Sequence, residues 1–271
     1  GMVLASGCGN KTLLRVATGN LKSLVVLLVM GLTGWMTLRG LTAVWRVATV
    51  DQWALALPVG QDLPSLLSHA TGWARDRAAL VAGLAVGGAC IAWALVREEG
   101  RRAETLIGGV GMGLIVTAVW WVTGRFGFVA EHPATLEPAF AGSGTGRMES
   151  VTFVAPAAGL LEWLVFYSDA SRVLNVGIVL LLGVLAGGLG DALLSRRFRW
   201  EGFRDAADLR RHLAGATMMG VGGVTALGCT FGQGLSGVST LGLTSWTALT
   251  ALIAGAVAGL RWQMAQLERE A

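Results

Sequence analysis

The feature that most constrains this chain is a long stretch without a formal charge near its end. No Lys, Arg, Asp or Glu occurs between Arg211 and Arg261. A helix needs about 20 apolar residues to cross a hydrocarbon core about 30 Å thick. Shorter stretches of this kind occupy residues 23–38, 78–96, 105–124 and 173–190. The sequence therefore predicts several helices that cross a membrane.

The composition supports the same class of protein. Apolar residues make up 54% of the chain and charged residues 14%, against about 25% charged residues in a soluble domain. The chain contains 40 Gly and only 5 Pro, which suits membrane helices that pack closely through small residues. The net charge of +4 is too small and too localised for a nucleic-acid partner. We expect an all-α polytopic helix bundle in a lipid bilayer.

The arginines predict the orientation. Clusters at 97–102 and 196–211 are both expected in the cytoplasm, because cytoplasmic loops are rich in Lys and Arg. Residues 125–150 then lie outside, and residues 151–166 cannot cross fully without moving the second cluster outside. We expect 151–166 to be half-length or to lie on the membrane surface, with Glu162 facing protein or water.

The second arginine cluster has two further interpretations. It could be a docking face for a soluble partner. Alternatively, residues 195–213, which mix Arg with aromatic residues, could form an amphipathic helix on anionic lipid.

The two ends of the chain resemble each other. GMVLASGCGNKTLLRVATGNLKS stands at the start and GGVTALGCTFGQGLSGVSTLGLTSW near the end. Aligning Cys8 with Cys229 also pairs Gly1 with Gly222, Val3 with Val224, Ala5 with Ala226, Gly7 with Gly228 and Leu14 with Leu235. Paired glycine-interrupted apolar segments in two halves of a chain are typical of a transporter's binding site.

Such breaks can bind an anion. Non-helical backbone at membrane depth survives only when it is buried in protein or lines a cavity, and the freed N–H groups at a helix start attract negative charge. The candidate path residues supply thiol, amide and hydroxyl donors without a carboxylate: Cys8, Asn10, Lys11, Thr12, Asn20, Cys229, Thr230, Gln233, Ser236 and Ser239. A thiol is a weak polarisable donor suited to a soft sulfur atom. The alternative is that each Cys is a small buried hydrophobe, the role we expect for Cys90.

No cofactor or metal site is indicated. The three His are scattered and no Cys-x-x-Cys occurs, so a zinc or iron–sulfur site has few ligands. GVGMG at 110–114 lies inside an uncharged span and follows no strand, unlike a dinucleotide-binding loop.

GCGNKTLLRVATGNLKS and GCTFGQGLSGVSTLGLTSW resemble the two motifs of the YeeE/YedE family of bacterial inner-membrane proteins. The resemblance implies inverted repeats around a central passage and uptake of thiosulfate past Cys8 and Cys229 by S–H hydrogen bonds. It also implies a cytoplasmic TusA-like sulfur carrier as a partner. The family has a further Phe-Cys segment near its N-terminus, which we expect to precede Gly1.

The sequence thus predicts one transmembrane domain. Residues 1–96 are expected to end the first repeat half, residues 97–150 to connect the halves and residues 151–271 to form the second. The expected function is thiosulfate transport, not an enzyme reaction. Two alternatives remain: transport of another sulfur or selenium species, or a sulfurtransferase that carries a persulfide on a cysteine, with Lys11 near Cys8 as the activating cation.

Overall fold

The computed structural model describes residues 1–53, 57–131, 136–169 and 171–270. The α-helices are α1 Gly9–Ala17, α2 Leu21–Arg39, α3 Leu41–Ala48, α4 Leu63–Thr71, α5 Arg75–Val96, α6 Ala103–Arg125, α7 Val154–Val165, α8 Val176–Leu194, α9 Ala206–Thr225 and α10 Leu243–Glu270. The short elements are the 3-10 helices Val50–Gln52 and Glu99–Arg101, the π-helix Gly232–Gly237, and the antiparallel strands β1 Phe128–Val129 and β2 Ala139–Phe140. The all-α class is confirmed.

Five helices are long and apolar enough to cross a membrane: α2, α5, α6, α8 and α10. The first four coincide with the four shorter uncharged stretches of the sequence, and α10 fills the end of the last one. Asn20, Asn175 and Asp205 cap α2, α8 and α9, each accepting a hydrogen bond from a backbone N–H three residues ahead. Such caps satisfy a free donor of the first helical turn and fix where the helix begins.

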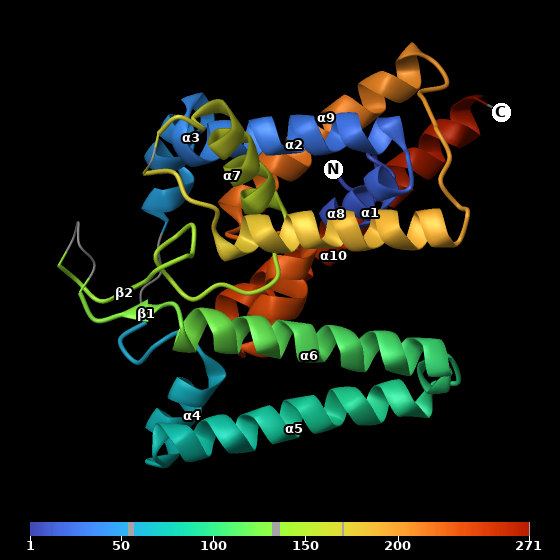
Figure 1. Ribbon diagram of the computed structural model, residues 1–271. Coiled ribbons are helices and arrows are strands. Elements are labelled where there is room, and N and C mark those ends of the chain that lie inside the picture. Colours follow the sequence, from blue (N-terminus) through green and yellow to red (C-terminus); the bar gives the residue numbers. More distant parts are fainter. Residues whose placement is uncertain (54–56, 132–135, 170, 271) are drawn as a thin grey trace.

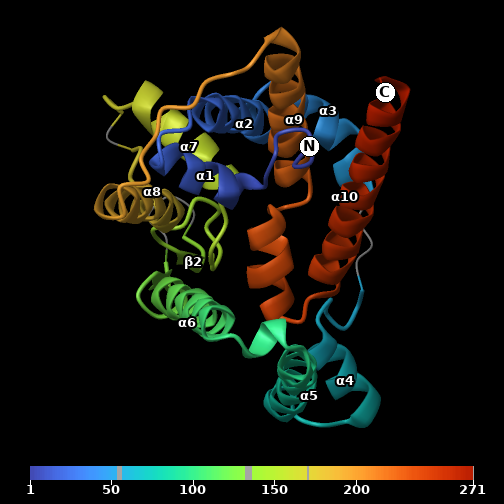
Figure 2. The same cartoon turned by 90° about the vertical axis from the view of Figure 1, so that its right-hand side faces the viewer.

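The axes of α2, α5, α6 and α8 are nearly parallel, with α2 and α6 running opposite to α5 and α8, while α9 and α10 cross them obliquely (Figures 1 and 2). The α5–α6 turn and the α8–α9 connection lie at the same end of the bundle (Figure 1). We call this the arginine-rich end, since it carries Arg97, Arg101 and Arg102 together with the arginines of 196–211. This shared placement agrees with the expectation from the sequence that both arginine clusters lie on the same side of the membrane.

The half-length prediction for residues 151–166 is confirmed. The helix in this segment, α7, has 12 residues, too few to cross a bilayer. Its start is buried at Phe153, and its far end lies at the opposite end of the bundle, where the Phe166 and Trp35 rings meet edge to face at 6.0 Å. Glu162 faces protein, because its carboxylate pairs with Arg39 and Arg172.

Residues 195–213 do not form one amphipathic helix. The chain is irregular from Ser195 to Asp205, and α9 begins at Ala206. Arg199 and Glu201 instead make backbone hydrogen bonds to the turn after α1. These contacts hold the connection in an extended form, so the helical interpretation was wrong for its first half.

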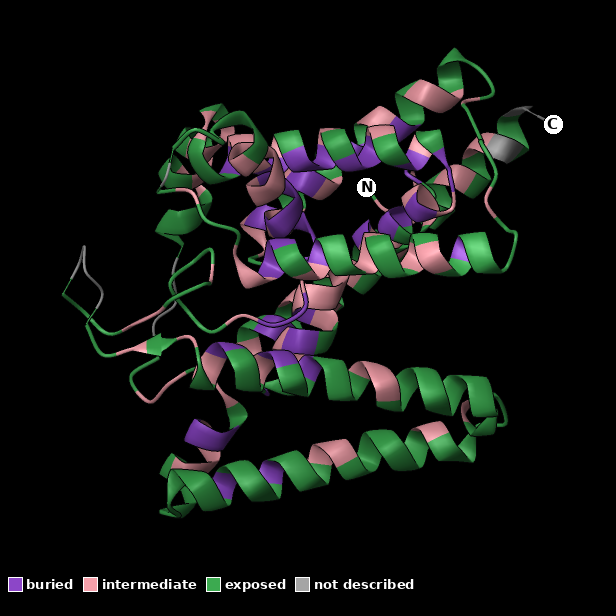
Figure 3. Ribbon diagram, in the orientation of Figure 1, coloured by how far each residue is buried: buried purple, intermediate pink, exposed green. Residues whose placement is uncertain are grey.

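The core lies where α2 packs against α7 and α9. Small residues allow this close approach, as in other membrane bundles. A Cβ added at Gly31 would meet α7, and one at Gly220 would meet α2. By contrast, α5 and α6 are exposed along most of their length (Figure 3), which suits a lipid-facing hairpin. Cys90 is exposed on α5, so the expectation that it packs inside the protein was wrong.

Candidate functional site: a cavity between two cysteine segments

Each of the two aligned cysteines stands directly before a short helix. Cys8 is the N-cap of α1, and Cys229 precedes a helical segment at residues 230–239 that contains the π-helix. The carbonyl of Cys8 accepts a hydrogen bond from Thr12 N at 2.9 Å, and that of Cys229 accepts one from Gln233 N at 2.8 Å. The likeness seen in sequence is therefore also a likeness of backbone structure.

The turns before the two cysteines match as well. Gly7 N donates to Met2 O, and Gly228 N donates to Gly223 O, each at 2.8 Å and each spanning five residues. Ser6 and Leu227, which stand two residues before the cysteines, both adopt left-handed backbone with φ of 60° and 56°. This six-to-one hydrogen bond with a left-handed residue is typical of a helix C-terminus. It turns the chain so that the next helix begins at the cysteine.

The two short helices run in opposite directions from the middle of the bundle. After α1, Leu21 N donates to Glu201 O at the arginine-rich end. After residues 230–239, Leu243 N donates to Gln61 O at the opposite end, beside α4. Each short helix is thus fastened by a backbone bridge and followed by a long helix, α2 or α10, that crosses back (Figures 1 and 2).

The second segment is one residue longer than the first. The left-handed residue that ends each segment is Gly19 in one and Leu241 in the other, one position apart when Cys8 and Cys229 are aligned. The π-helix Gly232–Gly237 lies within this interval. A π turn takes in one residue more than an α turn, so it accommodates the extra residue without moving the ends of the segment.

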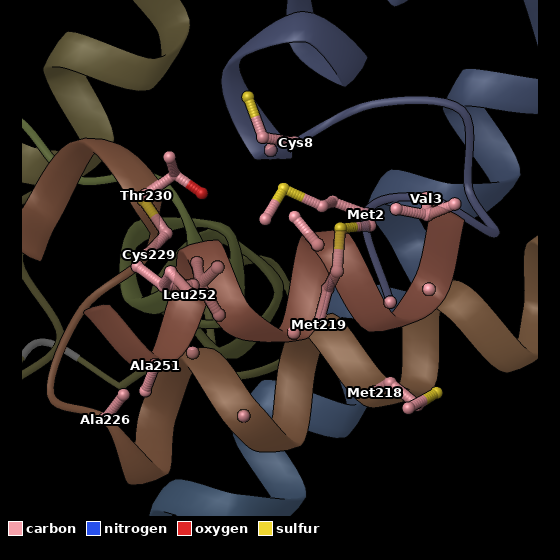
Figure 4. Close-up of a pocket in the computed structure, with 18 of the residues that line it drawn as sticks. Met2, Val3, Cys8, Met218, Met219, Ala226, Cys229, Thr230, Ala251 and Leu252 are labelled. Carbon is pink, nitrogen blue, oxygen red and sulfur yellow. The ribbon is translucent and has the colours of Figure 1, made fainter. Parts of the chain in front are cut away.

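A cavity of about 620 Å³ lies where the two segments meet. Both Cys8 and Cys229 line it, together with residues of α9 and α10 (Figure 4). Many of the lining residues are small: Gly1, Gly9, Gly222, Gly223, Ala226, Gly228, Ala248, Ala251, Gly255, Ala256, Ala258 and Gly259. The helix faces lack bulky side chains here, which is why a space remains between them.

The cavity is weakly positive without holding a charged side chain. None of the described side chains that line it is ionic. The N-termini of α1 and of the segment 230–239 both open onto it at the cysteines, and helix N-termini carry a partial positive charge. Cys229 is 8% exposed, and its Sγ lies 3.5 Å from Gly232 N and 3.8 Å from Thr152 Oγ1. The arrangement can attract an anion yet holds it with few strong bonds.

Among the candidate path residues, the structure brings Cys8, Cys229 and Thr230 to the cavity. Thr12 is buried and donates to the Cys8 carbonyl. Asn10 is half-buried and Lys11 exposed on α1, while Asn20 caps α2 and donates to Glu201 at 2.7 Å.

The remaining candidates hold the second break in place. The Gln233 amide donates to Ala226 O and accepts from Ser245 Oγ, both at 2.7 Å. Ser236 is buried and donates to Val151 O at 2.9 Å. Ser239 is exposed, donates to Ser236 O and accepts from Trp120 Nε1. None of these three side chains lines the cavity, and the hydrogen bonds described here are all to other protein groups.

Three methionines also line the cavity and were not singled out from the sequence: Met2, Met218 and Met219. Figure 4 shows the thioethers of Met2 and Met219 in the space near Cys8. Thioether sulfur is soft and polarisable, so it adds to the sulfur-rich lining. In the sequence, the Met218-Met219 pair within a glycine-rich stretch could have indicated that these residues line a cavity.

Comparison with known proteins finds a similar transporter and a matching family model. The E. coli (strain K12) thiosulfate transporter TsuA is 33% identical over 111 residues, which cover 41% of this chain and 31% of that protein. The matched region thus spans about a third of the relative's length. A family model described as "Sulphur transport" matches residues 1–258, nearly the whole chain. With five membrane-spanning helices and both cysteine motifs in place, the chain belongs to the sulphur transport (YeeE/YedE) family of membrane proteins.

Proposed function

We propose that this chain forms the passage of a bacterial inner-membrane transporter for thiosulfate and that Cys8 and Cys229 relay the anion by thiol hydrogen bonds. The observation that carries this proposal is that both cysteines line one cavity at the starts of two oppositely directed short helices. The two segments are the matching elements of inverted repeats. The thiosulfate relative supports the choice of substrate.

The chemistry favours passage over tight binding. Conduction requires binding that is favourable enough to enter and weak enough to leave. An S–H group is a weak donor, so a soft anionic sulfur can exchange one thiol for the next. The partial charges of two helix N-termini offset the desolvation of the anion in an otherwise apolar cavity.

Uptake of labelled thiosulfate by a sulfur-auxotrophic strain that carries the complete gene tests the proposal. Cys229→Ala and Cys8→Ala should each lower the initial rate by roughly tenfold or more, while Cys90→Ala, on the exposed face of α5, should keep the wild-type rate. A Cys229→Ala protein that is present in the membrane and transports at the wild-type rate would end the relay proposal.

Another sulfur or selenium species is the first alternative. The described side chains that line the cavity offer soft sulfur atoms, but they do not distinguish thiosulfate from other anions with a soft terminal atom. Competition of thiosulfate uptake by sulfite, sulfate and selenium oxyanions would rank them. Thiosulfate should compete best, because the relay needs a terminal soft sulfur.

A sulfurtransferase is the second alternative. A cysteine thiolate would attack the outer sulfur of thiosulfate, the S–S bond would break, and sulfite would leave with the bonding pair. This step needs an activated thiolate beside a base or cation, and none of the described side chains lining the cavity is charged. The intact mass after exposure to thiosulfate should therefore show no added sulfur atom on Cys8 or Cys229.

We further propose that a TusA-like carrier binds at the arginine-rich end, where the transported anion leaves the protein. Arg196, Arg197 and Arg210 are exposed there. Cross-linking in cells that express both proteins should join the carrier to this connection, and replacement of the three arginines by Ser should abolish the cross-link.

A further inference from the structure

A second cavity, of about 310 Å³, lies at the end of the bundle opposite the arginine-rich end. It is bounded by the end of α2, by α7, by the start of α8 and by the loop at residues 142–145. Its polar side chains include Arg39, Arg172 and Glu162. By the orientation deduced above, this cavity opens toward the outside of the cell.

Glu162 holds the two arginines together. Its Oε1 lies 2.8 Å from Arg172 Nη1 and 3.2 Å from Arg39 Nη1. The Glu162 side chain is 13% exposed, against 56% for Arg39 and 35% for Arg172. One oxygen of a largely shielded carboxylate therefore joins two guanidinium groups that remain more exposed.

Arg172 also carries a donor that lacks a partner. Its Nε is buried and makes no hydrogen bond to any residue that the structure describes. The nearest acidic oxygen, Asp169 Oδ2, lies 3.6 Å away, beyond hydrogen-bond distance. A buried N–H without an acceptor is uncommon in folded proteins, and here it belongs to a guanidinium that lines a cavity.

We call this second space the outer cavity and the space between the two cysteines the central cavity. The two cavities adjoin at Thr152 and Cys229. Thr152 lines the outer cavity, and its hydroxyl lies 3.8 Å from Cys229 Sγ. Cys229 in turn lines the central cavity. Thr152 thus borders the outer cavity and contacts a residue of the central one.

We propose that the outer cavity is the receiving site for a doubly charged sulfur oxyanion. Arg172 and Arg39 bind the oxygen atoms, because guanidinium groups match such oxygens in paired hydrogen bonds. The anion displaces the Glu162 carboxylate from them, and its terminal sulfur is directed to Thr152 and Cys229. This inference rests on the proposed transport function and adds the site at which the substrate is first held.

The acidic groups keep this site weak. Besides Glu162, Glu149 lines the cavity, and its Oε1 accepts hydrogen bonds from the backbone and hydroxyl of Thr145. Two carboxylates balance the two guanidinium groups, so a bound anion is always opposed by negative charge nearby. A transporter needs this balance because an anion held too firmly could not move on.

The site divides recognition between two steps. The arginines contact only oxygen, so sulfate, which has the same charge and lacks a terminal sulfur, should compete for the outer cavity. Cys229 contacts the terminal sulfur and passes thiosulfate onward. Sulfate is therefore expected to inhibit uptake without being transported at a comparable rate.

Initial rates of labelled thiosulfate uptake by the complete protein in proteoliposomes test the inference. In Arg172→Gln the KM should rise roughly tenfold, the expected effect of losing one charge-assisted hydrogen-bonding partner, and the inhibition constant of sulfate should rise in parallel. In Glu162→Gln the KM should fall roughly threefold or more, since the competing carboxylate is gone. Arg125→Gln, an exposed arginine at the end of α6 outside this cavity, is the matched control and should keep the wild-type KM.

The outcomes separate this inference from the proposed function. Wild-type protein that does not take up thiosulfate would overturn the proposed function. Wild-type uptake with an unchanged KM in Arg172→Gln, or with an unchanged or higher KM in Glu162→Gln, would overturn the receiving site alone. A misfolded variant cannot lower the KM, so the Glu162→Gln result decides even where Arg172→Gln folds poorly.

Discussion

The two central thiols have different surroundings. Cys229 is buried, and its sulfur accepts a hydrogen bond from the Gly232 backbone. Cys8 is only half-buried, and its side chain makes no such capping bond. Cys229 can therefore present its S–H in a fixed direction, whereas the Cys8 side chain has more freedom. We infer that Cys229 discriminates between anions more strongly than Cys8.

Gln233 shows how polar groups hold a break at membrane depth. Its amide nitrogen donates to Ala226 O and its amide oxygen accepts from Ser245 Oγ. Gln233→Ala would remove the partner of Ala226 O and of the buried Ser245 hydroxyl, and leaving a buried polar group unsatisfied costs about 1–3 kcal/mol. We expect the unfolding temperature in detergent to fall clearly. Ser239→Ala, at an exposed site of the same segment, should change it little, and equal stability of the two variants would contradict this role.

The sequence could identify some of these residues but not all. Cys8 and Cys229 were predictable because each lies in a glycine-rich frame that occurs twice. Thr152 was not predictable, because its hydroxyl meets Cys229 from a segment 77 positions away. Asn20 and Gln233 were grouped with the path from their polarity, yet in the structure both make bonds that fix backbone ends.

Among the helices, the breaks were predictable and their detailed form was not. Glycine-rich polar stretches in apolar surroundings indicate interrupted helices. A full crossing by residues 151–166 would have placed the two arginine clusters on opposite sides of the membrane, so a short α7 was expected. The π-helix at Gly232–Gly237 has no sequence signature of its own. The second cysteine segment has one residue more than the first between two ends that backbone hydrogen bonds hold in place. The positions of those ends are known only from the structure.

The contact between α2 and α9 depends on Gly220. A Cβ at this position would lie 2.6 Å from Met30 O and 2.9 Å from Gly34 N, and it would also collide with the Thr33 hydroxyl. The nearby atoms are largely backbone and cannot move aside, so Gly220→Ala should cost about 1–3 kcal/mol, the usual range for overpacking. Gly183→Ala on α8, where nothing lies within 4 Å, is the control. Thermal unfolding in detergent that gave equal midpoints for both variants would refute this contact.

The link between α4 and α10 should depend on pH. Asp62 caps α4 and forms a backbone bridge to Gly242 before α10. Burial opposes its ionisation, but hydrogen bonds from the Ser65 hydroxyl and backbone N–H, together with the Arg75 guanidinium, lower the pKa of Asp62 below its ordinary value. Because the folded pKa lies below the unfolded one, the stabilisation is complete above pH about 4 and is lost as pH falls through the folded pKa.

Asp62→Asn tests this dependence, since Asn keeps the cap but not the charge. The variant should have a lower unfolding midpoint than wild type at pH 7, and the difference should shrink when both proteins are unfolded at pH 3. A difference that stays constant or grows on acidification would show that the ionised carboxylate does not stabilise this link.

At the scale of the whole molecule, hydropathy and charge determine most of the architecture. The crossing helices were predictable because a bilayer requires about 20 apolar residues in a row. Their orientation across the membrane stays a prediction from the positions of the arginines. The joint placement of α1 and the segment 230–239 was not predictable from these rules. It depends on the backbone bridges of Leu21 with Glu201 and of Leu243 with Gln61, which connect residues far apart in the sequence.

The resulting arrangement joins an outer cavity, a central cavity and an arginine-rich end in one order along the molecule. The outer cavity holds two arginines balanced by carboxylates. The central cavity is apolar and sulfur-rich. This order suits an anion that is first attracted by the arginines, then recognised by the cysteines through its soft sulfur atom, and finally released toward the cationic loops.

Chemical bridging of Cys8 to Cys229 tests the central claim most directly. The complete protein, with Cys90 and every other cysteine except Cys8 and Cys229 replaced by Ser, would be reconstituted in liposomes. It would be treated with a short reagent that links two thiols, and thiosulfate uptake and the intact mass would be measured on the same sample. The account predicts a single linker that joins both cysteines and a loss of uptake that matches the fraction bridged. Separate linkers on the two cysteines, or full uptake by bridged protein, would contradict it.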